Sequence, residues 1–259
     1  MRQGSLERGI DMLSLLASLD RSLDAPGIAS RCGIPKSSAY RILQVLRQRG
    51  LVDASPDGGG YRPGVILLRW AATLRHGLDL VQVASPVLRR LAHATGETAT
   101  VTLLQGNRAV VANVTDTTAP LRVTSQVGRS LPLHAGASSK AILAFLPRTR
   151  WRQAVGEGRL LAFTGKTITN RQRLWRECER IRALGFAQSD EEVLLGARGV
   201  ASPVFDERGM VCGSLAVAGP RQRLQGKRLR LAVALVKQEA QALSRSLGFS
   251  GFGETDKLQ

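Results

Sequence analysis

Hydrophobic residues recur at helical spacing through the first fifty residues. Leu6 and Ile10 share one helix face, and Gly33 and Gly50 each follow an apolar periodic stretch, where glycine can end a helix. A run of Ser, Pro, Asp and Gly at 55–60 separates two short apolar segments and predicts a turn. The expected order is helix, helix, helix, strand and strand, over residues 5–19, 25–32, 37–49, 51–54 and 61–63.

The pattern changes after residue 64. Residues 65–95 are largely apolar and helical, with interruptions expected at His76-Gly77 and at Pro86. Further on, strands mix with helices and are joined by tight turns, which is typical of an α+β domain with an antiparallel sheet. The expected strands cover 97–105, 108–115, 121–126, 198–205 and 210–218. The expected helices cover 137–146, 170–184 and a final segment that ends near residue 247.

Residues 25–44 carry the pattern of a helix-turn-helix. Ala29 is small enough to let two helices cross closely, Gly33 makes the turn between them, and Ile34 fills it. The second helix then has a buried stripe that includes Ala39 and Leu43. Together with the hairpin that follows, this predicts a winged helix-turn-helix, a fold that places its second helix in the major groove of DNA.

The same pattern leaves polar side chains on the outer face of the second helix, most of them near its N-terminus. Arg and Gln can form paired hydrogen bonds with base edges, whereas Ser and Lys suit phosphates. Arg62, beside the hairpin tip, is either a backbone or minor-groove contact or plain surface. The candidate DNA contacts are Lys36, Ser37, Ser38, Tyr40, Arg41, Gln44 and Arg62.

Charge supports a nucleic-acid partner. The 259-residue chain has a net charge of +17, and between Ala25 and Val52 it has five basic residues and no acidic one. Such an excess favours DNA, RNA or an anionic membrane surface, although a merely solvated helix face remains the alternative. No stretch of 18 apolar residues is present, so we expect no membrane span.

The composition gives little support to a secreted or metal-binding protein. The N-terminus lacks the apolar run and cleavage site of a signal peptide. The three cysteines are odd in number and far apart, and no histidine has a second His or a Cys at metal-ligand spacing. We therefore expect a cytoplasmic protein with no metal, no cofactor and no disulfide framework.

Two segments invite an enzymatic interpretation. The Gly136–Lys140 segment fits neither a nucleophile elbow nor a Ser-x-x-Lys pair, because Ser138 lacks the required glycine and position 137 is alanine. The acidic run Asp190, Glu191 and Glu192 consists of adjacent carboxylates, which point in different directions on a loop, so surface or salt-bridge roles are favoured. We predict no catalytic residues.

Strand alternation in the second half predicts a surface of small side chains. Along 210–218, Ser214, Ala216 and Ala218 share one face, and Gly199 and Ala201 on the preceding strand are again small. Two neighbouring small faces leave volume above the sheet. Periodicity alone does not separate a ligand cavity from close packing of a helix on the sheet.

Several motifs in order along nearly the whole chain resemble those of the IclR-type transcription regulators. They are Ser-Leu-Glu-Arg-Gly at 5–9, Lys-Ser-Ser-Ala-Tyr-Arg-Ile-Leu at 36–43, Arg-Gly-Leu-Val at 49–52, Leu-Pro-Leu-His-Ala at 131–135, Lys140, Asp-Glu-Glu at 190–192, Ala-Ser-Pro-Val-Phe-Asp at 201–206 and Ala-Gly-Pro at 218–220. The resemblance implies a GAF- or profilin-like sensor domain, a small organic effector, a homodimer or dimer of dimers, and a palindromic double-stranded DNA operator. It favours the cavity over close packing.

On this basis the predicted organisation has four parts. They are a winged helix-turn-helix at 1–64, linker helices at 65–95, an effector-binding and oligomerisation domain at 96–248, and a disordered tail at 249–259. The free N–H groups and hydroxyls of 136–139 would suit a carboxylate. The candidate effector contacts are Gly136, Ser138, Ser139, Ser189, Asp190, Gly199, Ser214, Ala216 and Ala218.

The candidate cavity departs from the family in one respect. In members that bind small oxoacids, polar side chains occupy positions that match Gly199, Ala216 and Ala218 here. The wall is therefore more apolar, and we expect an aromatic or larger apolar acid. Two other interpretations stay open: a DNA-binding regulator with a purely structural dimerisation domain, and a ligand-binding protein whose charge serves RNA.

Overall fold

The computed structural model describes residues 4–19, 21–55, 58–73 and 75–251. The chain forms two compact units that divide between His76 and Gly77, within the predicted linker. Each unit has its own hydrophobic core.

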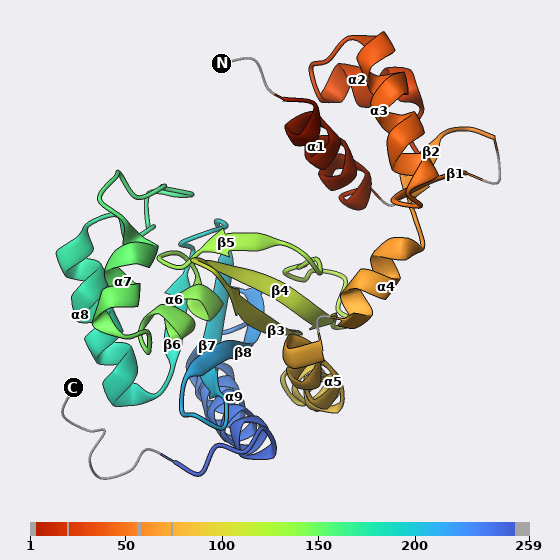
Figure 1. Cartoon of the computed structure of the whole chain (residues 1–259). Helices are drawn as coiled ribbons and strands as arrows, with labels where there is room; N and C mark the ends of the chain where they lie inside the picture. The colour runs from red at the N-terminus through yellow and green to blue at the C-terminus, as the bar shows by residue number, and fades with distance from the viewer. Residues whose placement is uncertain (1–3, 20, 56–57, 74, 252–259) are drawn as a thin grey trace. The chain divides into compact units, whose positions relative to one another are not determined.

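The first unit is a three-helix head with a small hairpin and a following helix (Figure 1). Met12 and Leu16 of the first helix pack with Ile28 and Leu43 of the next two in an apolar core. Asp24 caps the second helix by accepting a hydrogen bond from the Gly27 N–H at 2.9 Å. The elements are α1 (Ser5–Ala17), α2 (Ala25–Arg31), α3 (Lys36–Gln48), β1 (Val52–Ala54), β2 (Tyr61–Pro63) and α4 (Ile66–Thr73).

The second unit is built on a six-stranded antiparallel sheet with the order β5-β4-β3-β8-β7-β6. The mixture of helices with an antiparallel sheet confirms the α+β class predicted from the sequence. Its strands are β3 (Thr98–Gln105), β4 (Arg108–Thr115), β5 (Ser130–Pro132), β6 (Ala187–Asp190), β7 (Ala197–Phe205) and β8 (Val211–Pro220). Its helices are α5 (Arg75–Thr95), α6 (Ala137–Leu143), α7 (Arg148–Val155), α8 (Arg171–Leu184) and α9 (Gly226–Ser246).

The two faces of this sheet carry different side chains. One face presents Val101, Val204 and Leu215 to an apolar core shared with α5 and α9. The other face presents Ala201 and Ala216 to a second core shared with α6, α7 and α8. Figure 1 shows these two groups of helices around the sheet. Small side chains on the α6 face leave room between the sheet and the helix.

One predicted strand is wrong. Residues 121–126 are not a strand; β5 takes their place beside β4 instead, with Leu131 opposite Ala109. Val123 and Ser125 of this segment instead line a pocket. The short strand β6 and the helix α7 were not anticipated.

The helix and tail boundaries also differ from the prediction. Helix α5 runs through His76-Gly77 and through Pro86 without ending. Leu80, Leu88 and neighbouring residues of α5 keep a continuous apolar stripe buried, which offsets the hydrogen bond lost at proline. At the other end, the Phe249 ring stacks on Phe205 at 5.0 Å between centroids, so the fold extends into the predicted tail. Residues 252–259 lie outside the described part.

Candidate functional site

Helix α3 presents a polar face to solvent. Lys36, Tyr40, Arg41 and Gln44 are exposed along it, and Ser37 is exposed at its start. The opposite face buries Ala39, Leu43 and Leu46 in the core of the first unit. The 3.6-residue period therefore orients the predicted DNA-contacting side chains outward.

The turn before α3 sets its angle to α2. Gly33 has a φ of +64°, a conformation that glycine adopts at little cost, and the Ile34 N–H bonds back to the Ala29 carbonyl at 3.0 Å. Ala29 is 2% exposed, which fits the close crossing expected from its size. The local geometry is that of a helix-turn-helix.

The hairpin provides the wing. β1 and β2 pair with Val52 opposite Pro63 and Asp53 opposite Arg62. Arg62 is exposed, but a carboxylate lies directly across the strand pair from it, which weakens its case as a phosphate contact. Tyr61 lines a shallow groove with Arg41, Gln44 and other residues of α3.

The exposed groups on α3 are available to a partner. Within the described residues, the side chains of Lys36, Arg41 and Gln44 make no hydrogen bond or ion pair. A long cation or amide without an internal partner keeps its full hydrogen-bonding capacity for a ligand. Two cations and an amide on one exposed helix face suit the edges of bases and the phosphates beside them.

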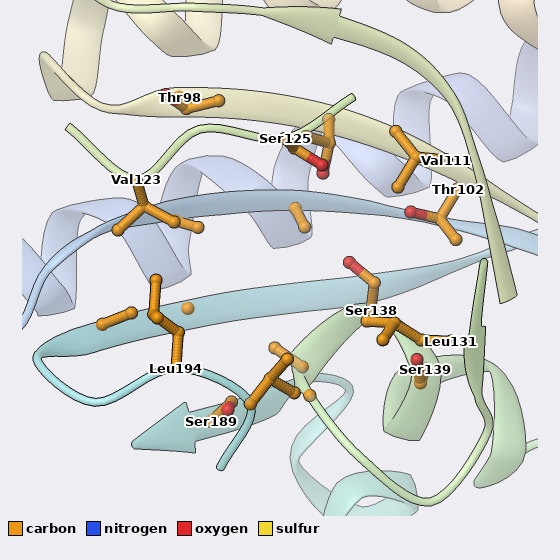
Figure 2. A pocket seen from close by; sticks show the side chains of 18 of the residues that line it. Thr98, Thr102, Val111, Val123, Ser125, Leu131, Ser138, Ser139, Ser189 and Leu194 are labelled. Carbon is orange, nitrogen blue, oxygen red and sulfur yellow. The ribbon is translucent and has the colours of Figure 1, made fainter. Parts of the chain in front are cut away.

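A pocket lies in the second unit between the sheet and α6. Its cavity volume is about 140 Å³. Strands β3, β4, β7 and β8 form its base, and the start of α6 and the loops at 123–125 and 193–194 form the walls (Figure 2). An engineered protein cavity of about 150 Å³ holds one benzene molecule, so this volume fits a ligand with a single six-membered ring. That size argues against the larger acid suggested by the sequence.

Seven of the nine predicted effector contacts line this pocket. They are Gly136, Ser138, Ser139, Ser189, Gly199, Ala216 and Ala218. Gly136 precedes α6 with a φ of +87°, which a residue with a Cβ adopts only under strain. Gly199 and Ala218 pair directly across β7 and β8, so the small residues form one continuous patch.

Two predicted contacts do not line the pocket. Asp190 pairs instead with Arg198, with the closest N–O distance 2.9 Å, and with Arg221. The alternation of β6 explains this, because Ser189 faces the pocket and its neighbour Asp190 must face away. Ser214 lies on the pocket face of β8, but beyond the lining residues, where it pairs with Thr102.

A row of threonines on β3 was missed by the sequence reasoning. Thr98, Thr100 and Thr102 line the pocket and lie opposite Ala218, Ala216 and Ser214 on β8. The signal was present as a polar residue at every second position. Such alternation usually marks a solvent-facing strand, and only the pairing order places β3 in the middle of the sheet.

A buried lysine joins the helix of the pocket to its loop. Lys140 of α6 is 1% exposed, and its Nζ donates to Glu192 Oε1 at 2.5 Å and to the Gln188 carbonyl at 2.8 Å. Glu192 Oε2 in turn accepts from the Gly136 N–H at 3.3 Å. These bonds fix the start of α6 against the loop that carries Val193 and Leu194 into the pocket.

The two preceding acidic residues, Glu191 and Asp190, also form bonds that hold this loop. Glu191 accepts from the Gly196 N–H at 2.8 Å and is ion-paired with Lys166, whose hydrogen bond lowers the pKa of the Glu191 carboxyl. Hydrogen bonding by Arg198 likewise lowers the pKa of Asp190. The acidic run therefore consists of salt-bridge partners, as the sequence favoured. Within the described residues, no cluster of three or more His, Cys, Asp or Glu side chains suits a metal ion.

The fold and the two sites define a class of protein: a winged helix-turn-helix DNA-binding head joined to an α+β sensor unit. Family models for the bacterial transcriptional regulator IclR C-terminal domain and for the IclR helix-turn-helix domain match residues 72–245 and 5–56. The chain thus belongs to the IclR family of DNA-binding transcription regulators. No helix in the described part is long and apolar enough to cross a membrane.

Individual relatives agree with this assignment. The chain is 30% identical to the HTH-type transcriptional repressor AllR of Escherichia coli strain K12 over 94% of this chain and 90% of the repressor. It is 31% identical to the regulator BhcR of Paracoccus denitrificans over 93% of this chain and 86% of that protein. The Thermotoga maritima IclR structure is similar with a TM-score of 0.76 and 26% identity, covering 95% and 99% of the two chains.

A further solved structure shares the fold and contains a ligand. It is an IclR homologue from Microbacterium hydrocarbonoxydans complexed with 4-hydroxybenzoate. Its TM-score to this chain is 0.79 at 23% identity, with 94% and 99% of the two chains covered.

Proposed function

We propose that this chain is a cytoplasmic regulator whose occupancy of a palindromic operator is controlled by a small organic acid. The pocket in the second unit is the observation that carries the proposal. A cavity lined mainly by small and apolar residues with a few convergent hydroxyls is the usual form of a small-molecule site. The pocket lies wholly in the unit that does not contain α3.

The DNA contacts in this proposal come from α3 and the wing. Arg41 and Gln44 read base edges, and Lys36 with Ser37 and Ser38 holds phosphates. Tyr40 is 52% exposed and lines the same groove as Arg41 and Gln44. Arg62 is the weakest member of the set because Asp53 faces it. The support is the exposure of the α3 residues on one face of a helix-turn-helix, although Ser38 is half-buried there.

A palindromic operator requires two copies, each reading one half-site. The first unit offers apolar side chains that its own core leaves uncovered: Leu6 is 77% exposed, Ile10 53% and Leu68 70%. Leu6 and Ile10 lie one turn apart on α1, and an exposed apolar patch of this kind is typical of a protein interface. We therefore propose that a second copy of this chain covers them, giving a homodimer or a dimer of dimers.

Filling the pocket tests the effector proposal. The full chain is screened by thermal shift against monocyclic organic acids, with 4-hydroxybenzoate among the probes, and operator binding is measured on DNA selected from a random library. Ala216→Trp is expected to abolish the ligand-induced shift and to leave operator affinity within about twofold. Ala216 is 5% exposed and lines the pocket from β8, so tryptophan there removes the space.

A milder variant and a control variant show whether a lost response comes from a filled pocket or from misfolding. A Cβ at Gly199 would meet its nearest neighbours at 3.6 Å, which is ordinary contact, so Gly199→Leu fills the pocket with less strain. Gly158→Leu adds the same side chain where nothing lies within 4 Å. If Ala216→Trp and Gly199→Leu respond to effector at wild-type concentrations, the pocket is elsewhere. If no acid shifts the wild type, the second unit is a structural dimerisation domain.

A further inference from the structure

The pocket contains hydroxyl groups that the protein itself leaves unbonded. Thr102 Oγ1 and Ser139 Oγ are buried and have no hydrogen-bond partner, and the same holds for Ser214 Oγ, which pairs across the strand from Thr102. Thr102 is 2% exposed, Ser139 1% and Ser214 0%. Buried polar groups are nearly always hydrogen-bonded, so three unpaired hydroxyls in one region require an explanation.

Two of these hydroxyls, those of Thr102 and Ser139, belong to residues that line the pocket, and both lie toward its inner end. Figure 2 shows Thr102, Ser138 and Ser139 with Leu131 toward one end, while Thr98 and Leu194 lie toward the other. Leu194 is 55% exposed, which marks its side as the mouth. At the mouth end the Thr98 hydroxyl is already used, because it donates to Asp116 Oδ1 at 3.2 Å.

The inner end suits a neutral group rather than a charged one. The charged residues that line the pocket are Arg129, which is exposed, and Arg198, which is paired with Asp190. A carboxylate buried without a cation loses more hydration than hydroxyls return, whereas a neutral hydroxyl or oxo group needs only hydrogen bonds. The cavity volume of about 140 Å³ leaves room for one ring between the two ends.

We propose that Thr102 and Ser139 form a subsite for a neutral hydrogen-bonding substituent of the ligand. The ligand class is a single-ring acid with a hydroxyl or oxo group opposite its carboxylate, and the carboxylate lies at the mouth. This inference rests on the proposed effector function and adds the orientation of the ligand and the residues that select it. A substituent that both donates and accepts satisfies the hydroxyls that the protein leaves unpaired.

The test compares two probes of equal shape by isothermal titration of the full chain. 4-Hydroxybenzoate carries the hydroxyl, and 4-methylbenzoate replaces it with a methyl group. The wild type is expected to bind 4-hydroxybenzoate at least about tenfold more tightly, the equivalent of one or two hydrogen bonds. Thr102→Val combined with Ser139→Ala is expected to remove this preference, because both changes delete a hydroxyl and nearly preserve shape.

Thr98→Val is the matched control, since it deletes a threonine hydroxyl on the same strand and face but at the mouth. It is expected to keep the preference for 4-hydroxybenzoate. Melting of the unliganded proteins gives a second readout: Thr102→Val is expected to melt at or above the wild-type temperature, because it removes an unpaired buried hydroxyl.

The outcomes separate this inference from the proposed function. Equal affinity of the wild type for the two probes, or a preference that survives in the double variant, overturns the subsite and leaves the pocket in place. A marked loss of unliganded stability in Thr102→Val also overturns it, because the hydroxyl would then have a partner in solution. Failure of both probes to bind overturns the ligand class, while the wider acid screen with Ala216→Trp still judges the effector function.

Discussion

Lys140 shows how one buried charge holds a site together. Its Nζ contacts Glu192 and Glu177 and is almost completely withdrawn from water. Burial alone would raise the pKa of Glu177, but hydrogen bonding by Arg180 and the charge of Lys140 lower it instead. An ion pair of this kind adds little net stability compared with an apolar pair, yet loss of one partner leaves the other charged and unsolvated.

We therefore predict a large effect of Lys140→Met on folding. The variant leaves the Glu192 carboxylate buried without its cation, at a cost of about 3–5 kcal/mol of unfolding free energy in a urea titration. Lys166→Met is the control, because Lys166 pairs with Glu191 but is 52% exposed. Its cost is expected to stay below about 1 kcal/mol. Equal costs for the two variants would show that Lys140 is not a structural anchor.

At the scale of single residues, the sequence predicts surroundings correctly where the chemistry of a side chain restricts the contacts that it can make. The sequence correctly favours salt-bridge roles for the adjacent carboxylates at 190–192, and it places Gly33 at the turn between two helices. It did not find the pairing of Glu192 with Lys140, which are 52 residues apart in the chain and meet only through the fold. Nor could it distinguish the direction of Asp190 from that of Ser189 without the exact limits of β6.

Helix α3 is the element whose periodicity was easiest to interpret. The buried stripe and the polar face follow from a single 3.6-residue repeat, and no long-range contact changes that assignment. β3 is the opposite case, because Thr98, Thr100 and Thr102 alternate with apolar residues yet are all buried. The neighbours on each side of a strand decide what its polar face contacts, and strand order is not encoded in the strand itself.

The proposed roles of α3 residues lead to a prediction about specificity. Arg41→Ala should cost about 1–3 kcal/mol on the selected operator and relax the preference at one base pair of each half-site, because the side chain that reads this base is removed. Lys36→Ala should weaken binding to all sequences alike. Selection from randomised DNA measures both effects. An unchanged sequence logo for Arg41→Ala would remove the assignment of Arg41 as a base contact.

The net positive charge of the whole molecule is not concentrated in its DNA-binding head. Residues 1–76 contain 11 Lys and Arg against 6 Asp and Glu, whereas residues 77–259 contain 26 against 14. Most of the net charge of +17 therefore lies outside the DNA-binding head. Total charge was a weaker guide to the DNA-binding surface than the acid-free stretch from Ala25 to Val52.

Binding to the operator should depend steeply on salt. With about six phosphate contacts per dimer, affinity is expected to fall on the order of a thousandfold between about 50 and 200 mM salt, because each contact releases counterions. A filter-binding series measures the slope, and Lys36→Ala should reduce it by about one unit for each phosphate that is no longer neutralised. A flat response in the wild type would mean that phosphates contribute little to binding.

The division between His76 and Gly77 has a consequence for how such proteins diversify. Every proposed DNA contact precedes this point, and every residue of the pocket follows it. Substitutions in one unit act on a hydrophobic core that the other does not share, so their effects on stability should add. A lineage can therefore alter the signal it recognises while keeping its set of target genes, or acquire new targets by recombination while keeping its signal.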